Sequence, residues 1–259
     1  MAMWTRTGPR GPRPRPPDDS GHMSVIWHDL ECGRYEADLP FWRALAAAHE
    51  GPILDVGAGT GRVTLDLARA GHDVTALDTD AELLSELACR ARGLSVSTVL
   101  ADARNFHLDA RFGLCLVPMQ TVQLLGGPAN RRAFLDCARE HLLPSGRVAV
   151  ALAAELDEFE VADGGPAPLP DVCELDGIVY SSAPTAVRAD GGGFILERRR
   201  EIVTRDGDLS SESDRIHLDH VEPGQFEDEA RTAGYTPAPR GEIAATRDYV
   251  GSVVVILDV

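Results

Sequence analysis

Short apolar runs alternate with helical patterns over residues 52–154. The runs 53–56, 74–78, 95–101 and 112–120 are typical of strands, and the fourth is nearly continuous until Pro118, as in a strand buried on both faces. Residues 81–92 and 128–143 instead carry apolar positions at helical spacing. Strands and helices that alternate in this way predict an α/β fold with a doubly wound, Rossmann-like sheet.

The pattern changes on both sides of this region. Residues 155–170 are acidic and rich in proline and glycine, and strands are then predicted at 172–180, 185–188, 194–203 and 211–220. Turn residues at 190–193 and 205–208 predict antiparallel hairpins between them. A helix over 222–235 and a strand over 249–259 follow. On the N-terminal side, residues 24–30 are amphipathic, and a helix interrupted near Pro40 is predicted over 35–50.

A glycine-rich turn follows the first strand. Gly57, Gly59 and Gly61 form a G-x-G-x-G pattern that is led by Asp55. Glycines let the backbone adopt positive φ and approach a ligand closely. A dinucleotide-binding sequence, G-x-G-x-x-G, would need glycine at position 62, which is Arg62. The turn therefore predicts an adenosyl ligand other than a dinucleotide.

Acidic residues lie at the carboxyl ends of the next two predicted strands. Asp78 ends the second strand, where ligands bind in open α/β sheets, and a carboxylate there can accept from both hydroxyls of a ribose. Asp80 is explained as the N-cap of the following helix. Asp102 follows the third strand with Ala103 beside it, and one interpretation of it is an ordinary turn aspartate.

These segments together resemble the class I S-adenosylmethionine-dependent methyltransferases over Pro52 to Ala154. The resemblance implies a seven-stranded sheet whose last strand is antiparallel, with S-adenosylmethionine as the cofactor. It also implies that Asp102 accepts a hydrogen bond from the adenine amino group. Inserted strands like those at 172–220 are similar to the lid of small-molecule N-methyltransferases. The cofactor-binding residues that we expect are Tyr35, Asp55, Gly57, Ala58, Gly59, Gly61, Asp78, Thr79, Asp102, Ala103, Pro118 and Gln123.

The resemblance divides the chain into five parts. These are a disordered Pro/Arg-rich tail (1–22), N-terminal lid helices (23–50), the cofactor-binding core (51–154), an inserted antiparallel lid sheet (155–220) and a C-terminal helix and strands that complete the core (221–259). Residues just past the fourth strand face the transferring methyl group in the family, so we expect Gln120 to be catalytic and Met119 to contact substrate. Trp27 in the lid is the other expected substrate residue, with plain packing as its alternative.

A general base is expected on the inserted sheet. His217 shares one face of its strand with Arg215 and Asp219, while His220 lies on the other face. We assign His217 as the base, so that His217→Ala lowers turnover without changing cofactor affinity. Each histidine has an ordinary surface position as its alternative.

Methyl transfer to a nitrogen or oxygen of a small molecule or peptide terminus is the function that these features predict, by in-line displacement. An NAD-dependent oxidoreductase could use the same sheet and Asp78 and also stays open, although it conflicts with Arg62 and with an antiparallel last strand. A protein that binds S-adenosylmethionine without methylating, such as a regulator or a cyclase, shares every cofactor residue and stays open.

Composition narrows the partners. The chain has 259 residues and a formal net charge of −16, which argues against binding to a nucleic-acid backbone. All its basic residues are arginine, which suggests a bacterial genome rich in G and C. The five cysteines are scattered and form no metal-binding spacing, and no apolar run is long enough for a membrane helix. We expect a cytoplasmic protein without a metal, and a homodimer through the lid sheet.

Overall fold

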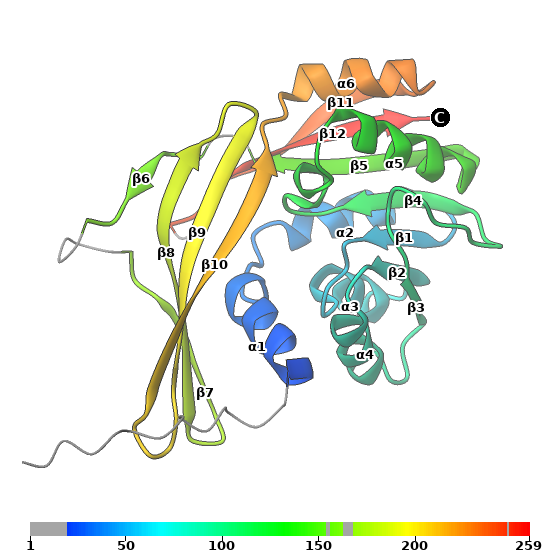
Figure 1. Cartoon of the computed structure of the whole chain (residues 1–259). Helices are drawn as coiled ribbons and strands as arrows, with labels where there is room; N and C mark the ends of the chain where they lie inside the picture. The colour runs from blue at the N-terminus through cyan, green and yellow to red at the C-terminus, as the bar shows by residue number, and fades with distance from the viewer. Residues whose placement is uncertain (1–19, 154–155, 163–167, 248) are drawn as a thin grey trace, which may run out of the picture.

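The computed structural model describes residues 20–153, 156–162, 168–247 and 249–259. Within these ranges the strands form two sheets (Figure 1). The first has seven strands in the order β11-β12-β5-β4-β1-β2-β3. Its members are β1 (Ile53–Val56), β2 (Val74–Asp78), β3 (Val96–Leu100), β4 (Phe112–Val117), β5 (Leu142–Ala153), β11 (Thr236–Ile243) and β12 (Ser252–Asp258).

Strands β1 to β5 are parallel to one another, whereas β12 lies antiparallel between β5 and β11. This confirms the predicted seven-stranded sheet with an antiparallel last strand. β11 had no counterpart in the sequence-based prediction. Pro237 and Pro239 lie within it, and proline is tolerated there because β11 is an edge strand that pairs only with β12.

Helices cover both faces of the sheet, as a doubly wound fold requires. One face packs against α5 (Pro128–Glu140) and α6 (Pro223–Thr232) through a core that includes Phe134 and Phe226. The other face packs against α2 (Leu39–Ala47), α3 (Arg62–Arg69) and α4 (Ala81–Arg90). Pro40 lies in the first turn of α2, where its missing N–H costs nothing, so it begins this helix rather than interrupting a longer one.

The second sheet is antiparallel and lies beside the core in Figure 1. Its order is β10-β9-β8-β6, and β7 also pairs with β8. The strands are β6 (Phe159–Glu160), β7 (Asp171–Leu175), β8 (Ile178–Ala189), β9 (Gly193–Val203) and β10 (Leu209–Asp219). The predicted strand 172–180 is thus two strands, because Asp176 and Gly177 both have positive φ and form a tight hairpin turn.

Helix α1 (Ser20–Cys32) lies between the inserted sheet and the core. Trp27 and Leu30 pack against Tyr180 of β8, while Asp29 forms an ion pair with Arg90 of α4. The helix begins three residues before the predicted start of the lid at residue 23, and the rest of the predicted tail, residues 1–19, lies outside the described residues. α1 therefore joins the two sheets on the side where β1 and β2 end.

Candidate functional site

The site is formed where β1 and β4 end, at the point where the strand order reverses. β1 continues outward through β2 and β3, and β4 lies on its other side. Such a switch point is where open α/β sheets bind ligands. The turn after β1 carries Gly57 at φ 73° and Gly59 at φ 55°. A Cβ at Gly57 would lie 2.5 Å from Cγ2 of Thr121, and one at Gly59 would collide with the ring of His28, so both positions require glycine.

Asp78 fixes this turn to the end of β2. Its Oδ2 accepts a 2.8 Å hydrogen bond from the Gly59 N–H, and its Oδ1 accepts one of 3.0 Å from the Asp80 N–H. Asp80 itself accepts from the N–H groups of Glu82 and Leu83, which confirms it as the N-cap of α4. Asp78 is half-buried, and carboxylate oxygens have further lone pairs, so it can accept two hydroxyl groups beside the turn.

Asp55 lies beneath the turn and is fully buried. Thr64 Oγ1 donates a 2.6 Å hydrogen bond to its Oδ2, while Oδ1 has no hydrogen-bond partner within the described ranges. Burial raises the pKa of Asp55 to about 6, against the hydrogen bond from Thr64 and the charge of Arg62. A buried carboxylate oxygen without a partner is costly, so the site favours a cationic group there.

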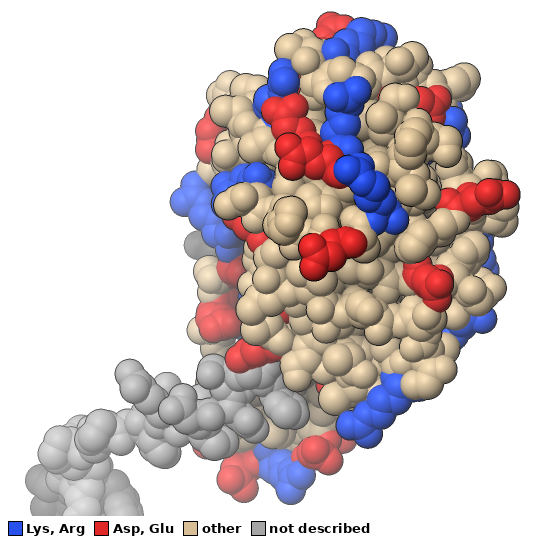
Figure 2. Space-filling model, turned by 90° about the vertical axis from the view of Figure 1, so that its right-hand side faces the viewer, with Lys and Arg blue, Asp and Glu red and all other residues tan. Residues whose placement is uncertain are grey.

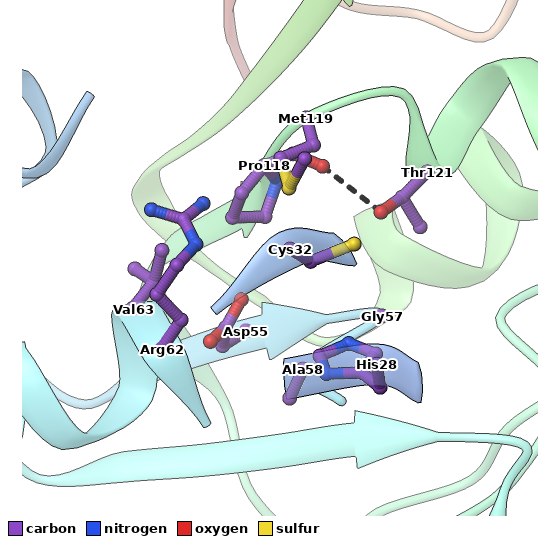
Figure 3. Close-up of a pocket in the computed structure, with 10 residues that line it drawn as sticks. All are labelled: His28, Cys32, Asp55, Gly57, Ala58, Arg62, Val63, Pro118, Met119 and Thr121. Atoms are coloured by element: carbon purple, nitrogen blue, oxygen red, sulfur yellow. Dashed lines mark hydrogen bonds between the residues drawn. The ribbon is translucent and has the colours of Figure 1, made fainter. Parts of the chain in front are cut away.

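A partly open cavity lies above Asp55. Figure 3 shows its lining side chains around one space between the glycine turn, the end of β4 and α1. Five predicted site residues line it: Asp55, Gly57, Ala58, Pro118 and Met119. Five other lining residues had no predicted role: His28, Cys32, Arg62, Val63 and Thr121.

Met119 has φ 54°, a conformation that is uncommon for a residue other than glycine. It follows Pro118 directly after β4, and the carbonyl of Pro118 accepts a 2.9 Å hydrogen bond from Thr121 Oγ1 (Figure 3). Residues in such strained conformations cluster at functional sites, because the surrounding structure must hold them there. That the chain just past the fourth strand faces the reaction stays a prediction.

His28 and Asp29 of α1 close the cavity over the glycine turn. Thr60 Oγ1 lies 3.2 Å from His28 Nδ1 and donates a 2.7 Å hydrogen bond to Oδ1 of Asp29. Burial alone would raise the pKa of Asp29, but the side-chain hydrogen bonds from His28, Arg90 and Thr60 lower it overall. Asp29 is therefore a firm ionic anchor that holds α1 over the turn.

Arg62 begins α3 and pairs with Asp38 through two hydrogen bonds of 2.5 and 2.8 Å. Its guanidinium also lies 5.0 Å from the ring centroid of Tyr35, and that ring is buried against Tyr249. Tyr35, a predicted cofactor residue, is thus held behind Arg62 and does not line the cavity. Arg62 stands where a dinucleotide-binding sequence would need glycine, and its side chain forms part of the cavity wall.

Asp102 and Ala103 follow β3, beside the end of β2, as predicted. The Asp102 carboxylate accepts hydrogen bonds from Nε and Nη2 of Arg104 on the surface, whereas Ala103 is buried. Thr79 is exposed next to Asp78, and Gly61 precedes α3 at φ 93°. None of the four residues Thr79, Asp102, Ala103 and Gly61 lines the cavity, and all four stay predicted cofactor contacts.

Three predicted site residues, Gln123, Trp27 and Gln120, do not line the cavity. The Gln123 amide donates to the Asp219 carbonyl at 3.0 Å and accepts from the Ala153 N–H at 2.8 Å, so it joins β10 to β5. Trp27 packs edge-on against Tyr180 and under Arg200. Gln120 precedes the short 3-10 helix η1 (Thr121–Leu124) and does not line the cavity. The structure thus gives Gln123 and Trp27 packing roles, because both are buried by contacts with the inserted sheet.

His217 is not brought to the cavity. Its side chain is 47% exposed, with Nε2 lying 3.4 Å from a carboxylate oxygen of Asp190. The alternation on β10 is as predicted, but the neighbouring Ile216 and Leu218 are the more buried residues, so His217 lies on the outward face. The prediction that His217 faces the pocket was wrong. Alternation shows which residues of β10 share a face, but it does not show which face packs against the core.

No group of three or more His, Cys, Asp or Glu side chains suited to a metal ion occurs in the part of the chain that the structure describes. Among the same residues, no helix is long and apolar enough to span a membrane. Figure 2 shows one face of the molecule on which basic and acidic side chains are interspersed.

Residues 53–146 match the family model for a methyltransferase domain. The chain is 31% identical over 113 residues to a probable cobalt-precorrin-6B C(15)-methyltransferase (decarboxylating) from Methanothermobacter thermautotrophicus, covering 42% of this chain and 56% of that protein. It is 32% identical over 117 residues to a cypemycin N-terminal methyltransferase from a Streptomyces species, covering 43% and 45%. The chain thus spans about half the length of these curated relatives.

The likeness to solved structures extends further. The sugar N-methyltransferase KedS8 from a Streptoalloteichus species superposes with a TM-score of 0.70 at 16% identity, over 99% of this chain and 98% of that one. Residues 53–146 are therefore similar to a methyltransferase domain, and the chain has the fold of the class I methyltransferases. The resemblance stated from the sequence is confirmed at this level.

Proposed function

We propose that this protein is an S-adenosylmethionine-dependent methyltransferase that acts on a nitrogen or oxygen of a small molecule or peptide terminus. The unpartnered oxygen of Asp55, buried beside the glycine turn, is the observation that carries the proposal. It favours a cation at the position where the turn lets a ligand approach most closely. The ammonium group of S-adenosylmethionine supplies that cation.

The residues around the cavity fit the rest of this cofactor. Asp78 accepts from the two ribose hydroxyls, while its bond to Gly59 keeps the turn open. Asp102 and Ala103 offer the adenine an acceptor and an apolar neighbour at the next strand end. When bound, the cofactor supplies an electrophilic methyl group on sulfur. Pro118 and Met119 then form the wall against which this group and its acceptor are aligned.

His28 is the histidine that we now propose for proton transfer or acceptor positioning. It lines the cavity together with Asp55 and Met119, whereas His217 is outside it. A nitrogen acceptor must lose its proton before it attacks, and an imidazole changes charge near neutral pH. Nitrogen is favoured over oxygen by two relatives: a Streptomyces fradiae protein named as an N,N-dimethyltransferase of an amino sugar, and the cypemycin enzyme, named as an N-terminal methyltransferase.

The experiment is a calorimetric titration of the full chain with S-adenosylmethionine and, separately, with NAD. We expect binding of the first only, since Arg62 and the antiparallel β12 do not suit a dinucleotide enzyme. A screen of amine, hydroxyl and carboxylate acceptors should then release S-adenosylhomocysteine. Preferential NAD binding would support an oxidoreductase. Cofactor binding without product from any acceptor would support a regulator or a cyclase.

A cytoplasmic location, the absence of a nucleic-acid partner and a homodimer stay predictions. The net charge of −16 supports the absence of a nucleic-acid partner.

A further inference from the structure

One face of β9 points toward α1 and the core. Arg200 identifies that face, because its guanidinium makes two 2.8 Å hydrogen bonds to Glu31 of α1 and lies over the Trp27 ring. Residues two apart on a strand share a face, so Arg198 points the same way. β9 begins beside the end of β10, close to η1, so Arg198 lies nearer the core than Arg200 does.

Arg198 and Asp214 are directly opposite each other on β9 and β10. Nη1 of Arg198 and Oδ2 of Asp214 are both buried and lack a hydrogen-bond partner among the described residues. Nη1 lies 4.0 Å from a carboxylate oxygen of Asp171, which is too far for a hydrogen bond. The other oxygen of Asp214 lies 3.2 Å from Nη1 of Arg200. A buried donor and a buried acceptor therefore lie side by side without partners.

This pair lies on the face of the inserted sheet that is turned toward α1, the helix whose last residue, Cys32, lines the cofactor cavity. Burial and the charge of Glu31 raise the pKa of the Cys32 thiol, and Arg198 lies near enough for its charge to oppose them. Cys32 lines the cavity at the end of α1. Burial also raises the pKa of Tyr249, and Arg198 opposes that shift as well. Arg198 is therefore on the lid side of α1, because β9 belongs to the inserted sheet (Figure 1).

We propose that Arg198 and Asp214 bind the methyl acceptor and select one that carries a carboxylate beside an amine or hydroxyl group. Nη1 of Arg198 donates to the carboxylate, and Oδ2 of Asp214 accepts from the neighbouring N–H or O–H. Arg198 and Asp214 face each other on paired strands, so one small molecule can meet both groups, as an α-amino or α-hydroxy acid does with its carboxylate and its neighbouring N–H or O–H. This inference rests on the proposed function and names its acceptor class.

The sequence offers a matched control on the same strand. Arg199 lies on the opposite face of β9, is 52% exposed and pairs with Glu201. Arg199→Gln therefore makes the same chemical change as Arg198→Gln one residue away, outside the proposed acceptor site. Arg198→Lys keeps the positive charge in case the glutamine variant does not fold.

The test uses α-amino and α-hydroxy acids, each compared with its carboxamide. Binding is measured by calorimetry in the presence of S-adenosylhomocysteine, and turnover by product release. For the unaltered protein we expect the carboxylates to be favoured by at least about tenfold in Kd or kcat/KM, as for one charge-assisted hydrogen bond. Arg198→Gln should abolish this preference and Arg199→Gln should keep it. Asp214→Asn should weaken the binding of both the acid and its carboxamide in each pair.

Cofactor affinity separates a failure of the proposed function from a failure of the proposed acceptor site. It should be the same in all these variants, which also shows that they fold. If the unaltered protein does not bind S-adenosylmethionine, the proposed function fails. If it binds the cofactor but no carboxylate binds better than its amide, or no member of the panel binds, the acceptor assignment is wrong. A preference that survives in both Arg198→Gln and Arg198→Lys equally overturns it.

Discussion

Thr64 donates a 2.6 Å hydrogen bond from its hydroxyl to Oδ2 of Asp55, across the first turn of α3. The second carboxylate oxygen is left buried and without a partner in the described structure. Thr64 thereby fixes the orientation of the Asp55 carboxylate, which lines the cavity (Figure 3). The protonation of this one group should therefore control the binding of a cationic ligand.

We expect the affinity for S-adenosylmethionine to rise with pH through about 6. Burial raises the pKa of Asp55 from 3.8 to about 6, so the ligand-free protein holds the neutral acid below that pH and the carboxylate above it. Only the carboxylate pairs with an ammonium group, and binding must displace the proton at lower pH. The affinity should fall about tenfold per pH unit below the pKa. Calorimetry across this range measures it.

Asp55→Asn is the control for this pH dependence. Asparagine cannot ionise, so the variant should bind the cofactor weakly and with little change across the same pH range. An affinity of the unaltered protein that is flat through pH 6, or a variant with the same pH profile, would show that another group controls binding.

Arg131 should be the main ionic link between the inserted sheet and the core. Its buried guanidinium makes two hydrogen bonds to Glu229 of α6 and one of 2.7 Å to Asp219 at the end of β10. Arg131→Met leaves both carboxylates without this partner, and breaking a buried pair from one side costs about 3–5 kcal/mol. Urea denaturation should show a loss of this size in the free energy of unfolding.

The neighbouring arginine provides the comparison. Arg132 is 43% exposed and pairs with Asp136 along the same helix, so Arg132→Met should cost less than about 1 kcal/mol. Equal losses from the two substitutions would mean that Arg131 does not have a special role in the attachment of β10.

We expect opposite effects on kcat/KM from substitution of His28 and of His217. His28 lines the cavity, so His28→Ala should lower kcat/KM for methyl transfer by at least about tenfold, since a positioned acid or base contributes more than that. His217→Ala should leave kcat/KM and cofactor affinity unchanged, because its side chain is exposed beside Asp190. Steady-state assays with one acceptor would compare them. A loss confined to His217→Ala would restore the base assigned from the sequence.

The features that the sequence predicted best are those at the ends of strands, both for the fold and for the cofactor-binding part of the site. Glycine and acidic residues placed directly after apolar runs located the turn at Gly57 and the carboxylate of Asp78, because the carboxyl ends of parallel strands meet at one edge. Local sequence sets these features, so they need no knowledge of distant contacts.

Contacts between distant elements were not predictable in the same way. His28 and Cys32 line the cavity because of how α1 packs between two sheets, and no local pattern shows which side of α1 faces inward. Gln123 was expected at the cofactor, but β10 and β5 provide its partners from far along the chain. The hairpin turn at Asp176 did have a local signal, because Asp-Gly is a strong turn sequence, and the predicted strand ran through it.

The binding of the cofactor ribose by Asp78 is tested most directly by calorimetric titration of S-adenosylmethionine into three proteins: the unaltered chain, Asp78→Ala and Asp80→Ser. Asp78→Ala should weaken binding by about 10- to 100-fold, as expected for lost hydrogen bonds to a carboxylate. Asp80→Ser keeps an N-cap for α4 and should bind normally. Undiminished affinity in Asp78→Ala would contradict the proposed cofactor site.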